Sequence, residues 1–124
     1  MLYDLNGRRI TEIPHRQEYD RWRRNVTDAN YAGVIEAIHH ELDAAIATSG
    51  DQAVVKSSWL PGRNWLNTPY HPIYLACGED FNAARLFYGL LCWDAVMQHA
   101  EGWRFYKEDD PTSPTGMTYF RYLP

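Results

Sequence analysis

The stretch from residue 57 to residue 71 holds the densest group of side chains able to bind a ligand. It combines large aromatic rings with an arginine, two asparagines and a histidine. The predicted ligand-binding residues are Trp59, Arg63, Asn64, Trp65, Tyr70 and His71. In this hypothesis the rings stack on a small molecule or peptide, while Arg63 and Asn64 orient its polar or anionic group. The alternative is a packed loop whose tryptophans anchor it to the core.

A second hypothesis makes His71 the general base of a hydrolase-like enzyme, because a histidine titrates in the range that acid–base chemistry needs. It requires a carboxylate or hydroxyl beside the ring, in a cleft. The Gly-x-Ser-x-Gly elbow is absent around Ser57 and Ser58. Cys77 and Cys92 fall in helical apolar patterns, which predict buried and inert thiols. No catalytic residue is therefore assigned.

Histidines and acids also recur at helical spacing. Glu36 and His40 are four residues apart, and so are His39 and Asp43. Two ligands on one helical face can begin a metal site, but a stable site needs a third or fourth, and the HExxH pattern is absent. The spacing predicts exposed histidines, with no metal and no cofactor.

Local signals predict the elements that position these side chains. Asn6-Gly7 indicates an N-terminal hairpin with a type I′ turn, and aromatic strands at 103–107 and 117–122 indicate a C-terminal hairpin. Residues 52–59 read as one further strand. Helices are predicted at 17–24, from the Thr27 cap to Gly50, at 73–77 and at 80–99. The order predicts an α+β fold: an antiparallel sheet built from the N- and C-terminal hairpins plus one central strand, with helices packed on one face.

The 80–99 helix carries apolar residues on two nearly opposite stripes. Such a helix must be covered all round, either by running through the domain centre or by a subunit interface. We predict a homodimer through the second stripe, which also supports a third hypothesis, a structural or protein-interaction role. That stripe consists of Leu86, Leu90, Trp93 and Met97. Asp94 lies within this apolar helix, and Arg63 or Arg85 is the expected partner of a paired, structural acid.

Length and charge limit the number of domains and the kinds of partner that the chain can have. The 124 residues fit one domain, 1–124, and the net charge is −4. The arginines between residues 16 and 24 alternate with Glu18 and Asp20, so they predict a solvated helix and no nucleic-acid partner. Residues 25–55 hold five acidic residues and no lysine or arginine, which predicts an acidic helix face. The sequence shows no signal peptide and no membrane span, which favours a cytoplasmic protein.

Three segments carry a resemblance. They read WLPGRNW at 59–65, TPYHPIYxAC at 68–77 and FYGLLCW at 87–93. They lie within residues 59–103, a region of about a third of the chain, and they resemble uncharacterised small bacterial proteins, including kinds carried on mobile gene cassettes. That group has no known function, so the resemblance implies no role for any residue.

Overall fold

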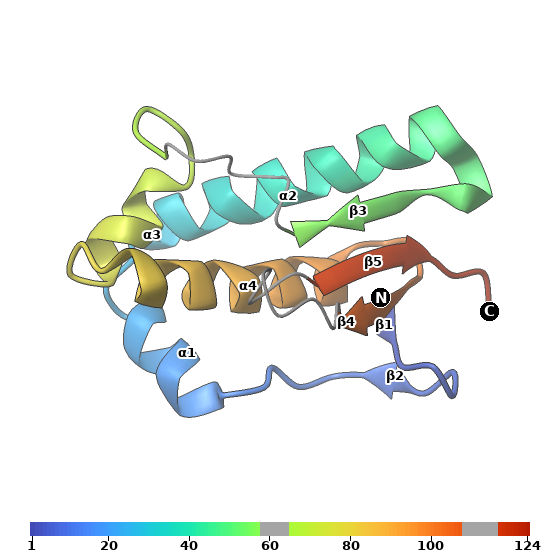
Figure 1. Ribbon diagram of the computed structural model, residues 1–124, viewed down its shortest axis with the longest axis horizontal. Coiled ribbons are helices and arrows are strands. Elements are labelled where there is room, and N and C mark those ends of the chain that lie inside the picture. The colour runs from blue at the N-terminus through green and yellow to red at the C-terminus, as the bar shows by residue number, and fades with distance from the viewer. Residues whose placement is uncertain (58–64, 108–116) are drawn as a thin grey trace.

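Helices and a small sheet follow one another along the chain of the computed structural model, which describes residues 1–57, 65–107 and 117–124 (Figure 1). The first half contains β1 (Leu2–Tyr3), β2 (Arg9–Ile10), α1 (Arg16–Arg23), α2 (Asp28–Ser49), the 3₁₀ turn η1 (Gly50–Gln52) and β3 (Val54–Lys56). The second half contains α3 (His71–Ala76), α4 (Phe81–Gln98), β4 (Trp103–Lys107) and β5 (Met117–Arg121). The α+β class predicted from the sequence is confirmed.

The strands form one mixed sheet in the order β2-β1-β4-β5-β3. Both predicted hairpins are present, because β1 pairs antiparallel with β2 and β4 pairs antiparallel with β5. The hairpins meet through β1 and β4, which run parallel, so the prediction of a purely antiparallel sheet is wrong at this pair. The strand from the middle of the sequence, β3, lies at an edge beside β5. Local turn signals specify each hairpin but carry no information on how distant hairpins join.

The β1–β2 turn differs from the predicted type I′ geometry. Only Gly7 has a positive φ (79°), and Asn6 is not among the residues with positive φ. The loop is longer than two residues, because Tyr3 pairs with Arg9. The Asp4 carboxylate accepts hydrogen bonds from the backbone N–H groups of Asn6 and Arg8, both at 2.9 Å. This side-chain capping stabilises the wider turn.

Helix α2 begins and ends where the sequence predicts. The Thr27 side chain accepts a hydrogen bond from the backbone N–H of Asn30 at 3.1 Å, which satisfies one of the free donors of the first turn. Gly50 ends the helix with a φ of 54°. The buried side of α2 carries Val34, Ile35, Ile38 and Leu42. Its opposite side is therefore free to line a site.

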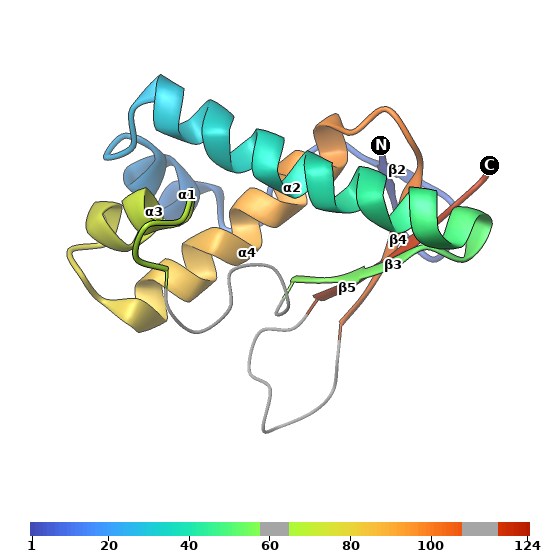
Figure 2. The same cartoon turned by 90° about the horizontal axis from the view of Figure 1, so that it is seen from above.

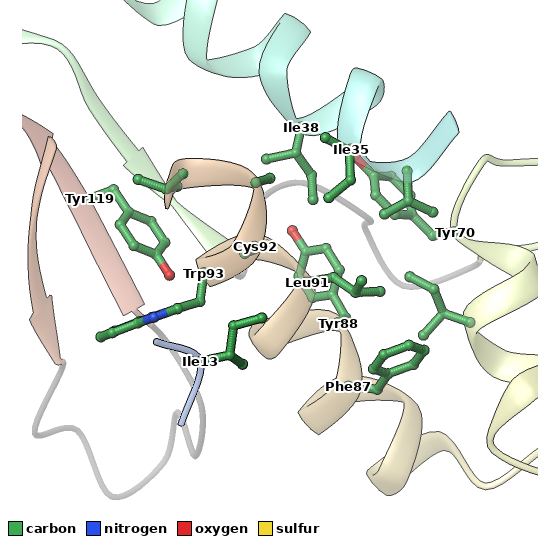
Figure 3. Packing of buried hydrophobic residues seen from close by; sticks show 14 of the residues in the cluster. Ile13, Ile35, Ile38, Tyr70, Phe87, Tyr88, Leu91, Cys92, Trp93 and Tyr119 are labelled. Carbon is green, nitrogen blue, oxygen red and sulfur yellow. The ribbon is translucent and has the colours of Figure 1, made fainter. Parts of the chain in front are cut away.

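Helix α4 runs through the centre of the core (Figure 3), in contact with α1, α2 and α3. Seen from above, α1 and α3 lie at the end of the molecule away from the sheet (Figure 2). Nine of the residues of α4 are buried, among them Phe87, Leu91 and Cys92. This enclosure explains most of its two-sided apolar pattern without a second subunit.

Candidate functional site

The described end of the predicted site loop, residues 65–71, is a closely hydrogen-bonded turn that leads into α3. The Thr68 hydroxyl donates to the Trp65 carbonyl at 2.6 Å and accepts from the Tyr70 N–H at 3.2 Å. Asn67 adopts a positive φ of 62°, a conformation that asparagine tolerates better than most residues. Pro72 lies in the first turn of α3, where its missing N–H costs no helical hydrogen bond.

Two of the predicted ligand-binding rings face the core. The exposed fractions of Trp65 and Tyr70 are 5% and 6%. The Trp65 ring lies 5.3 Å from that of Phe81 and 5.8 Å from that of Tyr88, between ring centroids. Burial raises the pKa of Tyr70 to about 12. Trp65 thus offers almost no ring surface to a ligand, while Trp59, Arg63 and Asn64 lie outside the described residues.

His71 lies half-buried at the start of α3. Its ring packs against Tyr74, with 6.2 Å between ring centroids. Within the described part of the chain, no carboxylate or hydroxyl forms a hydrogen bond with this ring. The hydrolase hypothesis therefore gains no catalytic partner from these residues.

A groove of about 630 Å³ separates the exposed side of α2 from the end of this loop. Pro69 and Tyr70 form the loop wall. The helix wall begins at Gly33, where an added Cβ would meet nothing within 4 Å. The titratable side chains along it are Glu36, His39, His40, Glu41 and Asp43. The lining residues in the described part of the chain include three carboxylates and no lysine or arginine, so the described walls of the groove are acidic. We call it the α2 groove.

The two histidines of the α2 groove have different roles. His40 and Glu36 are exposed, in agreement with their predicted position on the outer helix face. His39 is half-buried, and its Nε2 lies 2.7 Å from the Ala95 carbonyl oxygen of α4. His39 therefore joins the two helices and is not available as a freely exposed ligand.

Asp43 pairs with a buried histidine that the sequence did not connect to it. His99 is 5% exposed, and its Nε2 lies 2.8 Å from Asp43 Oδ1. Its Nδ1 accepts hydrogen bonds from the Trp103 indole N–H at 3.0 Å and from the Glu101 backbone N–H at 3.3 Å. Because Nδ1 is an acceptor, Nε2 carries the proton and donates it to Asp43. No spacing rule links residues 43 and 99, so this pair required the fold.

Asp94 forms the second buried polar cluster. Its Oδ2 accepts hydrogen bonds from the Tyr19 hydroxyl at 2.6 Å and from the Tyr31 hydroxyl, and its Oδ1 accepts from the Gln98 amide at 2.8 Å. The expected arginine partner Arg85 is not among these donors. Burial, followed by the bond to Asp94, raises the pKa of both tyrosines. Their hydroxyl groups thus stay protonated and act as donors.

The two cysteines and the metal-ligating side chains provide no reactive site in the described part of the chain. Burial raises the pKa of Cys92 to about 12 and that of Cys77 to about 11, so both thiols stay protonated at neutral pH. Across residues 1–57, 65–107 and 117–124, no three His, Cys, Asp or Glu side chains are grouped so as to hold a metal ion.

The predicted dimer stripe of α4 is partly covered within the chain. Trp93 is 9% exposed, packs against Phe105 and donates its indole N–H to the Glu12 carbonyl at 3.0 Å. Trp93 therefore offers little surface to a partner, and the predicted interface through this stripe stays a prediction. Leu86 is 52% exposed, and Leu90 is half-buried beside it.

No described helix is both long and apolar enough to cross a bilayer. Comparisons of the chain with protein-family models, with curated proteins and with solved structures give no match.

Proposed function

We propose that the protein is a cytoplasmic binding module whose ligand, a small molecule or short peptide with a cationic group, occupies the α2 groove. The proposal rests on one observation: the α2 groove has an acidic wall and an apolar wall that face each other. Glu36, Glu41 and Asp43 line one wall, while Pro69 and Tyr70 supply an apolar one. The volume of about 630 Å³ lies in the range of ordinary ligand sites.

Charge determines the class of ligand. A cationic group is attracted by the carboxylates of the helix wall, and an apolar stem packs against Pro69. This class differs from the anionic ligand expected from Arg63 and Asn64, because the described walls carry negative charge. Since the carboxylates are exposed, their attraction weakens as salt rises.

The test uses spermidine and arginine amide as probes, with binding followed by calorimetry and by the melting temperature. Both probes are expected to bind the parent protein, and the double variant Glu36→Gln/Glu41→Gln is expected to lose that binding. The double variant Glu12→Gln/Glu79→Gln is the control, because it removes the same charge from exposed positions outside the α2 groove. Equal weakening in both variants, or no binding by the parent, contradicts the proposal.

A specific observation favours a second candidate function, self-association through α1 and α4. A groove of about 200 Å³ lies between these helices, lined by His15, Glu18, Trp22, Leu86 and Leu90. In this candidate a second copy of the chain covers the exposed Leu86 side chain. Leu86→Lys is then expected to convert a dimer to a monomer in sedimentation velocity. Leu75→Lys is the matched control, because Leu75 is also 52% exposed but lies on α3. A monomeric parent protein contradicts this candidate.

A further inference from the structure

The two faces of the sheet differ in burial. In Figure 2 helices α2 and α4 lie on one side of the strands. By the strand register, one face of the sheet carries the buried strand residues. Leu2, Val55, Trp103 and Tyr119 belong to this face, with exposed fractions of 0–5%. Because side chains alternate along a strand, the positions between them form the opposite face.

Aromatic and basic side chains gather on the opposite face. We call these residues the open-face patch: Tyr3, Arg9, Arg104, Tyr106, Phe120 and Tyr122. They share this face because Tyr3 pairs with both Arg9 and Arg104, and Arg104 pairs with Phe120. In the described strands, no Asp or Glu occupies a position on this face.

The arginine at the centre of the patch stacks on an aromatic ring. The Arg104 guanidinium carbon lies 3.9 Å from the centroid of the Tyr122 ring, and the Tyr3 ring lies 5.1 Å from the same ring. No carboxylate of the described residues forms an ion pair with Arg104, and its buried Nε has no hydrogen-bond partner. Among the described residues the guanidinium of Arg104 is thus held by its stacking on Tyr122, which leaves its charge unneutralised by them.

Two further rings lie where bases can stack. Tyr106 is 52% exposed, and Phe120 is half-buried on the neighbouring strand. The register pairs Tyr106 with Thr118 and Arg104 with Phe120, which makes the two rings diagonal neighbours across the β4–β5 pair. Diagonal positions of this kind are about 7–8 Å apart, so adjacent bases of one extended strand can reach both rings.

We propose that the open-face patch binds single-stranded nucleic acid. Exposed rings on a sheet stack unpaired bases without regard to sequence, and Arg9 and Arg104 contact the phosphates. The net charge of −4 does not oppose this, because the carboxylates of the α2 groove lie on an element that packs on the other face of the sheet. The expectation of no nucleic-acid partner rested on the net charge and on the mixed charges of α1, neither of which reports how distant strands pair.

The test measures fluorescence anisotropy of labelled ten-nucleotide oligo(dT) and oligo(rU) with the full chain. Binding is expected to weaken with salt, with a log–log slope of about −1.4 for two phosphate contacts. Tyr106→Ala and Phe120→Ala are each expected to lower affinity about tenfold. Tyr106→Phe keeps the ring and is expected to retain affinity, which separates stacking from other effects of substitution.

Two exposed arginines supply the matched charge control. Arg9→Ala is expected to reduce the salt slope by about 0.7, and Arg21→Ala, on α1, is expected to leave it unchanged. Circular dichroism establishes that each variant is folded. The proposal is overturned if neither oligonucleotide binds, or if Tyr106→Ala and Phe120→Ala bind as well as the parent. It is also overturned if vesicles of phosphatidylserine bind the patch and the oligonucleotides do not.

Discussion

Tyr19 of α1 donates a hydrogen bond of 2.6 Å to the Asp94 carboxylate of α4, across 75 residues of sequence. Tyr31 of α2 donates to the same oxygen, so one buried acid holds three helices together. A buried carboxylate without donors is strongly destabilising. Tyr19 and Tyr31 supply two of those donors. Of the two arginines that the sequence suggested, Arg85 is not among the donors, and Arg63 lies outside the described residues.

Removing one of these donors tests the cluster. Tyr19→Phe is expected to lower the free energy of unfolding by about 1.5–3 kcal/mol, because a buried charged acceptor loses a donor. Tyr74→Phe is the control, with an expected change within about 0.5 kcal/mol, since its ring is half-buried and its hydroxyl makes no hydrogen bond in the described part of the chain. Urea denaturation measures both. Equal effects of the two variants would show that Asp94 does not depend on Tyr19.

Alkaline pH is expected to destabilise the fold through its buried tyrosines. Burial raises the pKa of Tyr70 to about 12 and raises that of Tyr19, Tyr88 and Tyr119 above the ordinary value near 10. The folded state therefore holds these protons after the unfolded chain has released them. Their contribution to stability is complete below pH 10 and falls as the pH rises above it.

Tyrosine absorbance at 295 nm measures this difference in proton binding. Ionisation in the folded protein is expected to finish at a higher pH than in the urea-unfolded chain. Coincident titration curves in a protein still folded at pH 11 would contradict the burial of these hydroxyl groups.

The Asp43–His99 pair is expected to respond unequally to loss of its two members. His99→Ala leaves the buried Trp103 indole N–H without its acceptor, which costs about 1–3 kcal/mol of stability. Asp43→Asn keeps an acceptor at an exposed position and is expected to cost under about 1 kcal/mol. Denaturation midpoints with a shared slope measure the difference. A larger loss of stability in Asp43→Asn than in His99→Ala would contradict this expectation, because the exposed carboxylate would then contribute more than the buried indole hydrogen bond.

Local features of this fold were readable from the sequence, and long-range ones were not. The Thr27 cap, the Gly50 end of α2 and both hairpins follow from a few neighbouring residues. The parallel β1–β4 pair depends on how Leu2 meets Trp103 and Tyr3 meets Arg104, far apart in the sequence, which no local pattern records.

In the candidate site, too, local features could be predicted from the sequence and long-range contacts could not. The acidic face of α2 was visible in the spacing of its residues, but the opposing wall at Pro69 and Tyr70 required the tertiary structure. Composition alone did not show that Trp65 turns inward, because a tryptophan fits equally a binding surface and a core. The donors to Asp94 were tyrosines from two other helices, where charge pairing had suggested arginine.

Filling the α2 groove tests the proposed function most directly. Gly33→Met places a side chain in open space at the helix wall, and it removes an interior helix glycine that costs about 1 kcal/mol. Ala47→Met introduces the same side chain at an exposed position of α2 outside the lining residues.

The decisive measurement is calorimetric titration of spermidine into the parent protein and these two folded variants. The proposal predicts binding by the parent and by Ala47→Met, and none by Gly33→Met, whose melting temperature equals or exceeds that of the parent. Undiminished binding by Gly33→Met would place the ligand elsewhere and contradict the proposed function.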